Sequence, residues 1–428
     1  MSVLIRFILS IFIGLSLSSS QSHENALGIG FPVQNHDAAT AGVFPVNLLP
    51  TFQEGVSISN PSTWIQLNNT LLTGTFGGKK EEIQSGSLIN QNTFLQQFQF
   101  IIPVKNKYAF GLSITPNVNR YYLLFDDDIS IPDSIFNDIL SVRKSVLGSG
   151  GVGSLIPSIV FPITSSETMA LSLNYLFGSS RDYRTITIEG RDFIQKNNDI
   201  YSGLYLKLFV HSKRLTLRQK IVDLFISIQT ALKPLSINRT QHQPFEDITG
   251  TGIHESYDIF GDFPLTNLTP ASILVDSLGE SKPLEIQIGF DWEIKSRLHI
   301  QSGWSHWNDQ NKEIFSASVI NDQLLSLDKV GIGFILFSKK YPRKLLEHIH
   351  YRCGAFLKDI KLVHSNKKIN EIGVSFGFGF KFGVMENQID VGFSISKRTG
   401  FLVGDELLKQ FSVGLSLGDI WFIKRRER

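Results

Sequence analysis

Cysteine is nearly absent from this sequence, which has 428 residues and a single cysteine, Cys353. One thiol cannot form an intrachain disulfide, and it cannot supply a metal site built from cysteines. The simplest interpretation of Cys353 is a packing residue, with a reactive thiol as the alternative.

Strong charge of either sign is also missing. The chain has 41 Lys and Arg against 39 Asp and Glu, a formal net charge of +2. Phosphate binding needs concentrated Lys and Arg, so this balance argues against nucleic acid as a partner.

Motifs that carry enzyme chemistry are missing as well. The Gly-rich stretch 148–154 has no Lys-Ser/Thr and no following helix, so a phosphate-cradling loop is not expected there. The acidic stretch 126–128 lacks the spaced ligands of a calcium loop. His348 and His350 lie two residues apart, on one face of a strand, but no ligand set that would complete a metal site is apparent around them. We therefore expect no enzyme, no cofactor and no metal site.

Long apolar runs are absent beyond residue 21, where no stretch reaches the roughly 18 residues of a transmembrane helix. The first residues differ, because an apolar run (7–17) follows Arg6 and precedes the small residues 18–20. This pattern predicts a secretory signal peptide at 1–20, cleaved after Ser20. An uncleaved anchor is the alternative, but the run is short for a membrane span.

What the chain does have is alternation of large apolar and small residues. In the stretch EIGVSFGFGFKFG (371–383) every second residue is large and apolar, and Gly373, Gly377 and Gly379 lie between them. Such runs are about ten residues long, the length a tilted strand needs to cross a bilayer. We expect the large residues to face lipid. The three glycines are then predicted to face the lumen and to leave room for whatever fills it.

Counting these runs predicts an all-β fold, a transmembrane antiparallel barrel of about 14 strands, an even number as in single-chain bacterial barrels. The predicted strands are 66–76, 93–104, 106–115, 154–163, 167–177, 199–211, 215–230, 282–295, 297–307, 328–338, 347–364, 369–383, 387–397 and 409–422. The segment 215–230 also suits an amphipathic helix.

Connector lengths support a barrel, since short turns alternate with long connections as in outer-membrane barrels. The long connections, predicted to be external loops, include 116–153, 178–198 and 231–281. Apolar residues at helical spacing predict a short amphipathic helix at 131–142, with Asp133 or Ser134 as its N-cap.

The segment 21–65 precedes the first strand and does not alternate regularly. Its apolar residues predict a plug packed inside the barrel, with a disordered leader as the alternative. We expect the barrel itself to span 66–423 and a charged periplasmic tail to occupy 424–428.

Four stretches resemble the FadL-type family of outer-membrane transporters for hydrophobic compounds. The early ALGIGF (26–31) and SISNPSTW (57–64) are similar to that family's N-terminal hatch with its Asn-Pro-Ala element. Here Asn60 and Pro61 match the element, and Ser62 replaces the alanine. The stretch 284–309 resembles the family's hairpin with an aromatic-polar-Trp step. The C-terminal region from 351 onward looks like a version common in Bacteroidetes-related bacteria.

The resemblance implies a porin-like barrel of fourteen strands plugged by its N-terminal segment, in the outer membrane of a Gram-negative type of cell. It implies passive uptake of hydrophobic small molecules such as long-chain fatty acids, with Asn60 and Pro61 as hatch structure. The expected partners are the outer-membrane lipid bilayer, a hydrophobic small-molecule substrate and the barrel assembly machinery. The alternative is a non-transport barrel that binds a protein partner or serves a secretion pathway.

Overall fold

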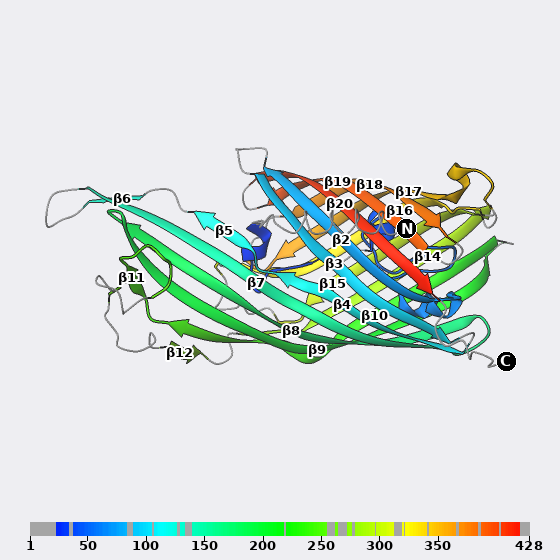
Figure 1. Ribbon diagram of the computed structural model, residues 1–428, viewed down its shortest axis with the longest axis horizontal. Coiled ribbons are helices and arrows are strands. Elements are labelled where there is room, and N and C mark those ends of the chain that lie inside the picture. The colour runs from blue at the N-terminus through cyan, green and yellow to red at the C-terminus, as the bar shows by residue number, and fades with distance from the viewer. Residues whose placement is uncertain are drawn as a thin grey trace, which may run out of the picture.

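The alternating stretches form one closed antiparallel barrel (Figure 1). The computed structural model describes residues 23–33, 37–83, 89–104, 107–125, 129–132, 139–217, 220–254, 262–263, 272–275, 279–295, 297–311, 319–320, 322–339, 342–364, 368–383, 387–401 and 404–419. The predicted signal peptide and the charged tail lie outside these residues and stay predictions. No helix in the described residues is long and apolar enough to span a membrane.

Fourteen strands of the described chain make up the wall. They are β2 (Thr70–Ile83), β3 (Ile89–Val104), β4 (Tyr108–Asn119), β7 (Ile139–Pro162), β8 (Glu167–Ile188), β9 (Arg191–Leu217), β10 (Lys220–His242), β14 (Pro283–Lys295), β15 (Leu298–Asp309), β16 (Leu324–Leu336), β17 (Ile349–Leu362), β18 (Ile369–Phe382), β19 (Asn387–Phe401) and β20 (Gly404–Asp419). Each pairs with the next, and β20 returns to β2, from Thr70 opposite Asp419 to Ile83 opposite Glu406. This last pairing leaves no open edge, as a membrane barrel requires.

The predicted strands correspond one to one with these fourteen, and the helix alternative for 215–230 is wrong because that segment belongs to β9 and β10. The helix predicted at 131–142 is also wrong at both of its ends. There β6 (Ile129–Pro132) pairs with the start of β7, and Ile131 lies opposite Leu140. Residues 133–138, with both proposed caps, lie outside the described residues.

Four strands are much longer than predicted. β7, β8, β9 and β10 have 24, 22, 27 and 23 residues, against 12 for β15 and 13 for β14. The predicted long loop 178–198 is therefore wrong, since β8 and β9 continue to a tight turn at Glu189 and Gly190. Apolar alternation stops where a strand leaves lipid, but backbone pairing does not, so our criterion missed these parts of the strands.

We call the far ends of these four strands, 142–153, 178–188, 191–203 and 231–242, the wall extension; they contain most of the residues added to the predicted strands. Figure 1 shows it reaching beyond one end of the barrel, at the left of the view. The predicted loops 116–153 and 231–281 hold further short strands beside it. These are β5 (Tyr122–Phe125), β6, β11 (Phe245–Asp247), β12 (Ser272–Val275) and β13 (Glu280–Ser281). We call this end the extended end.

The opposite end carries the tight connections, for example those joining β7 to β8 and β14 to β15. We call it the short-turn end. Bacterial barrels keep short turns on the periplasmic side, which predicts that this end faces the periplasm.

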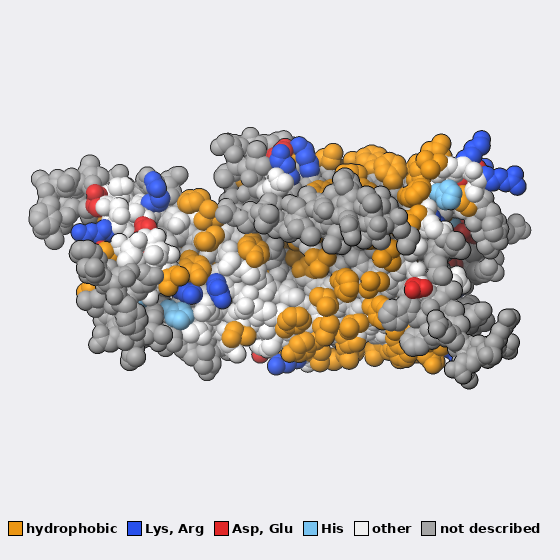
Figure 2. All heavy atoms as spheres, in the orientation of Figure 1, with side chains coloured by type: hydrophobic (Ala, Val, Ile, Leu, Met, Phe, Trp, Pro, Cys, Tyr) orange, Lys and Arg blue, Asp and Glu red, His pale blue; other side chains and the backbone are white. Residues whose placement is uncertain are grey.

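The outer face of the barrel is apolar. Along β18 exposure alternates residue by residue, with Ile372 at 62 %, Phe376 at 54 % and Phe378 at 50 %, while the residues between them are buried. Figure 2 shows apolar side chains gathered over the barrel toward the short-turn end, and a more polar surface over the extended end. A band of exposed apolar side chains of this kind is the surface that lipid solvates.

The N-terminal segment lies partly inside the barrel. It contains η2 (His23–Ala26), β1 (Phe31–Pro32), α2 (Ala38–Ala41) and η3 (Pro61–Gln66). β1 pairs with β4 near the extended end, and η3 contacts β7 and β8 near the short-turn end. The segment thus runs along the lumen from one end of the barrel to the other.

Candidate functional site

The candidate site is the lumen together with residues 37–66, which we call the plug. The N-cap of its first helix, α2, is Asp37, whose Oδ1 accepts a hydrogen bond from the backbone N–H of Thr40 at 2.9 Å. Asp37 also accepts from the Ser59 hydroxyl at 2.8 Å. One N-cap carboxylate therefore joins both ends of the plug, which favours a single compact conformation.

Asn60 and Pro61, the predicted hatch residues, lie at the start of η3. Pro61 takes the first helical position, where its missing N–H costs nothing. The fully buried Asn60 side chain accepts from the N–H of Ser62 at 3.1 Å and donates to the carbonyl of Leu48 at 2.7 Å. Asn60 thus holds two turns of the plug together. That the two residues work as a hatch stays a prediction.

The plug meets the barrel wall at glycines. A β-carbon added to Gly377 would lie 2.7 Å from the α-carbon of Gly42, closer than two carbon atoms approach, so only glycine fits at this contact. Elsewhere plug side chains occupy the space beside wall glycines: Trp64 at Gly111, Leu49 at Gly289, Phe44 at Gly331 and Val43 at Gly333.

The other two predicted lumen glycines lie against wall side chains. An added β-carbon on Gly379 would lie 2.5 Å from Asp390 Oδ1 and 2.9 Å from Arg352 Nη1. One on Gly373 would lie 2.7 Å from the β-carbon of Ser396. Gly379 therefore makes room for an ion pair that in turn holds the plug.

Polar side chains of the wall bind plug carbonyls. Arg352 donates from Nε to the carbonyl of Thr51 at 2.9 Å and pairs with Asp390 at 2.7 Å. The plug carbonyl of Pro50 accepts from Gln301 at 2.7 Å, and that of Ser62 accepts from Thr168 at 2.7 Å. The irregular backbone of the plug is thus satisfied by the wall, as buried backbone requires.

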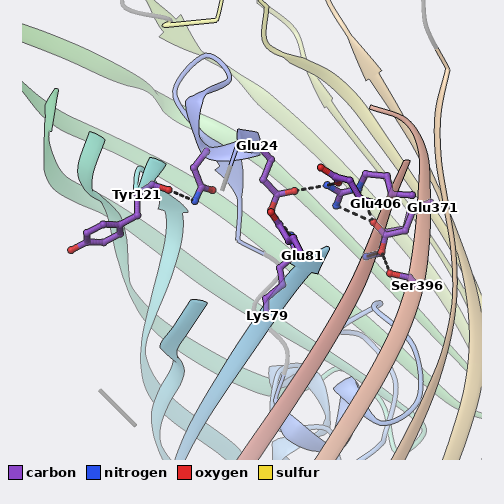
Figure 3. A network of polar contacts seen from close by, with 10 residues as sticks. Glu24, Lys79, Glu81, Tyr121, Glu371, Ser396 and Glu406 are labelled. Atoms are coloured by element: carbon purple, nitrogen blue, oxygen red, sulfur yellow. Dashed lines mark hydrogen bonds and ion pairs between the residues drawn. The ribbon is translucent and has the colours of Figure 1, made fainter. Parts of the chain in front are cut away.

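At the extended end, η2 is held by buried charges (Figure 3). Glu24 accepts from Arg398 at 2.8 Å and pairs with Lys79, which also pairs with Glu81 at 2.7 Å. Arg398 reaches Glu371 at 3.1 Å and Glu406 at 3.2 Å. Lys358 pairs with Glu371 at 2.8 Å. We call these seven residues the anchor cluster: Glu24, Lys79, Glu81, Lys358, Glu371, Arg398 and Glu406. Burial by itself raises the pKa of Glu24, but Lys79 and Arg398 lower it to about 2, so Glu24 is ionised at neutral pH.

A second buried network joins the same end of the segment to the wall extension. Arg120 is almost fully buried and donates from Nη1 to the carbonyl of Gly28 at 2.7 Å. Tyr122 donates to Asp182 at 2.6 Å, and Arg239 pairs with both Asp182 and Asp199. The extension is therefore tied through charged groups to the chain that enters the lumen.

The lumen retains small cavities. One of about 90 Å³ lies beside the anchor cluster, and its lining combines the charged residues of that cluster with apolar side chains such as Phe31, Phe44 and Phe356. A second of about 130 Å³ lies beside Trp64 and is lined mainly by Gln, Ser, Thr and Asn side chains of β3, β4, β7 and β8. The lining of the second cavity suits water and polar groups rather than an apolar molecule.

Our reading of the sequence missed the anchor cluster and the Arg120 network. A signal was present, since Glu371, Lys358 and Lys79 are charges inside strands that alternate with lipid-facing residues. Alternation assigns these charges to the lumen. It does not predict that residues from five strands and from the segment 23–26 lie in one cluster.

Solved structures share this fold. The chain matches the CymD monoaromatic hydrocarbon channel over 93 % of this chain and 99 % of that one, with 9 % identity and a TM-score of 0.55. It matches a Pseudomonas aeruginosa FadL homologue over 91 % and 99 %, with 10 % identity and a TM-score of 0.54. The Ralstonia pickettii toluene transporter TbuX matches over 90 % and 98 %, with 10 % identity and a TM-score of 0.51.

At these identities the likeness concerns the fold alone, and it confirms the FadL-like outer-membrane barrel that the sequence predicted. A search of curated proteins found no significant match. One protein-family model, described as BamG, matches residues 51–427, from within the plug through the whole described barrel. The chain belongs to the BamG family.

Proposed function

We propose that this protein is a non-transport outer-membrane barrel that binds protein partners as a component of the barrel assembly machinery. Membership in the BamG family is the observation that carries the proposal. The barrel is then a scaffold held in the membrane, and its ends and outer wall are the surfaces available to partners. Export through a cleaved signal peptide at 1–20 belongs to the same proposal.

The contacts between the segment 23–66 and the wall support a scaffold rather than a channel. Opening the lumen requires the segment 23–66 to leave the wall, and this would separate Glu24 from Lys79 and Arg398. Breaking one buried ion pair by removing a partner typically costs about 3–5 kcal/mol. The Arg120 contact and the hydrogen bonds from Arg352, Gln301 and Thr168 would be lost as well.

The size of the cavities supports the same conclusion. Sites for small apolar molecules are mostly lined by apolar side chains and measure roughly 300–1,000 Å³. The cavities of about 90 and 130 Å³ are smaller, and charged or amide groups line part of each. A long-chain fatty acid would have to displace paired charges to pass them. Passive uptake of hydrophobic molecules is therefore the weaker hypothesis, supported by the FadL-like fold only.

Two measurements on one preparation test the proposal. Full-length protein, tagged in the exposed turn at 250–252, is purified in mild detergent from its native membrane, and its partners are identified by mass spectrometry. We expect subunits of the barrel assembly machinery in constant ratio to the barrel. A tagged outer-membrane barrel of unrelated family, expressed at the same level, is the control.

The same protein is then reconstituted in liposomes with radiolabelled fatty acid and toluene, beside CymD as the positive control. We expect no uptake above protein-free liposomes. Uptake of either compound, together with a purification that lacks assembly subunits, would contradict the proposed scaffold function and favour a transporter.

A further inference from the structure

The connection between β16 and β17 presents two apolar side chains to the outside. It lies at the short-turn end and contains η4 (Leu345–His348). Leu345 is 71 % exposed and Leu346 is 68 % exposed, more than Phe376 or Phe378 on the lipid-facing row of β18. In Figure 1 this connection is the gold coil at the upper right.

The connection is held in shape by Glu347. Its carboxylate accepts from the backbone N–H of Arg343 at 2.8 Å and pairs with the Lys339 ammonium at 2.6 Å. Its carbonyl accepts from the N–H of Lys339 at 2.9 Å. The Arg343 N–H, followed by Lys339, lowers the pKa of Glu347 to about 2, so the carboxylate is ionised at neutral pH. The two leucines are therefore displayed on an ordered turn.

The turn lies on the lipid side of the wall. The ring of His348 contacts the ring of Phe380 with 6.1 Å between centroids. Phe380 belongs to the same outward row of β18 as Ile372 and Phe376. Leu345 and Leu346 thus extend the apolar band at its periplasmic edge.

The charge of the turn is positive. Arg343 and Lys344 are exposed and lie directly before the two leucines, and within 342–348 the only carboxylate, Glu347, pairs with Lys339. This arrangement is complementary to an anionic phospholipid, whose acyl chains can contact the apolar pair while its headgroup binds the exposed cations. Long cationic side chains reach headgroups while apolar neighbours enter the bilayer.

We propose that residues 342–348 form an interfacial phospholipid-binding site. Leu345 and Leu346 enter the acyl region of the periplasmic leaflet, and Arg343 and Lys344 bind the phosphate of an anionic phospholipid headgroup. The site would fix the depth of the barrel in the membrane, and it does not depend on the proposed role in barrel assembly.

The test uses an environment-sensitive fluorophore, NBD, on full-length protein carrying Cys353→Ala and Leu345→Cys, reconstituted in liposomes. We expect the NBD emission to lie at shorter wavelength than the emission of the same fluorophore in water. We also expect brominated phospholipid to quench it. The matched control is Ser165→Cys in the exposed β7–β8 turn at the same end, which should stay in water. Leu346→Cys is a second labelling position if the first variant folds poorly.

Headgroup choice is measured by comparing quenching by brominated phosphatidylglycerol with quenching by brominated phosphatidylcholine. We expect preference for the anionic lipid, reduced about fivefold by each of Arg343→Gln and Lys344→Gln. Emission as in water at both positions overturns the proposal. So does a shift that occurs only when barrel assembly subunits are added, because the occupant is then a protein.

Discussion

At the residue scale, the barrel wall meets the plug at glycines as well as at polar side chains. Gly377 and Gly42 bring two backbones together, and Trp64 occupies the space above Gly111. Glycine weakens a strand, because it has no side chain to pack and loses more entropy on folding. Here the contact with the plug offsets that cost, because the plug approaches these positions too closely for a larger residue.

Gly377→Ala is expected to destabilise the folded protein by about 1–3 kcal/mol, because the added methyl overlaps the backbone of Gly42. The measurement is the temperature at which the compact, heat-sensitive band disappears on a detergent gel. Gly74→Ala is the matched control, since its new β-carbon would meet its nearest neighbour, Phe98, at 3.9 Å. Equal melting of the two variants would contradict the close contact at Gly377.

At the scale of elements, ion pairs hold the four-residue helix η2 against the barrel wall. η2 is too short to be stable by itself, and its position follows from Glu24 and from the carbonyl of Gly28 that Arg120 binds. The apolar residues of the segment 21–65 predicted a plug, and the N-terminal segment does lie partly inside the barrel. Sequence reasoning could not find this second attachment, because the partners of Glu24 are Lys79 and Arg398, far along the chain.

Glu24→Gln is expected to release residues 23–33 from the wall while leaving the barrel closed. The substitution removes the carboxylate shared by Lys79 and Arg398, a loss of about 3–5 kcal/mol for a buried pair. Limited proteolysis of the purified protein should then cleave within 23–33, as read by mass spectrometry. Glu82→Gln, in the exposed pair with Lys409, should leave the fragment pattern unchanged. Protection of 23–33 in both variants would mean that Glu24 does not hold the segment.

At the scale of the whole molecule, the strands β7–β10 belong both to the membrane-crossing barrel and to the wall extension. The membrane-crossing part is a closed barrel whose wall carries apolar residues outward. The wall extension continues β7–β10 beyond it, with Asp182, Asp199 and Arg239 buried on its inner side. The closing pairs between β2 and β20 lie outside the extension.

Deleting 184–195 and joining Tyr183 to Lys196 by Asn-Gly should leave the barrel folded. Tyr183 and Lys196 are already opposite each other, so a two-residue hairpin turn fits the register. We expect the heat-sensitive band to persist with little change in its melting temperature. A deletion of the same size inside the apolar band, removing 169–174 with the paired 205–210, should abolish the band. Loss of the band in both would show that the extension is needed for closure.

The sequence by itself determined the number of strands, their order and their lipid-facing residues. All three follow from a period of two set by local chain geometry and by the demand that lipid contact be apolar. Only the tertiary structure decided how far β7–β10 run and which charges meet at Glu24 and Arg120. Backbone pairing continues through polar residues without a sequence signal, and ion pairs between distant segments form only after the wall has closed.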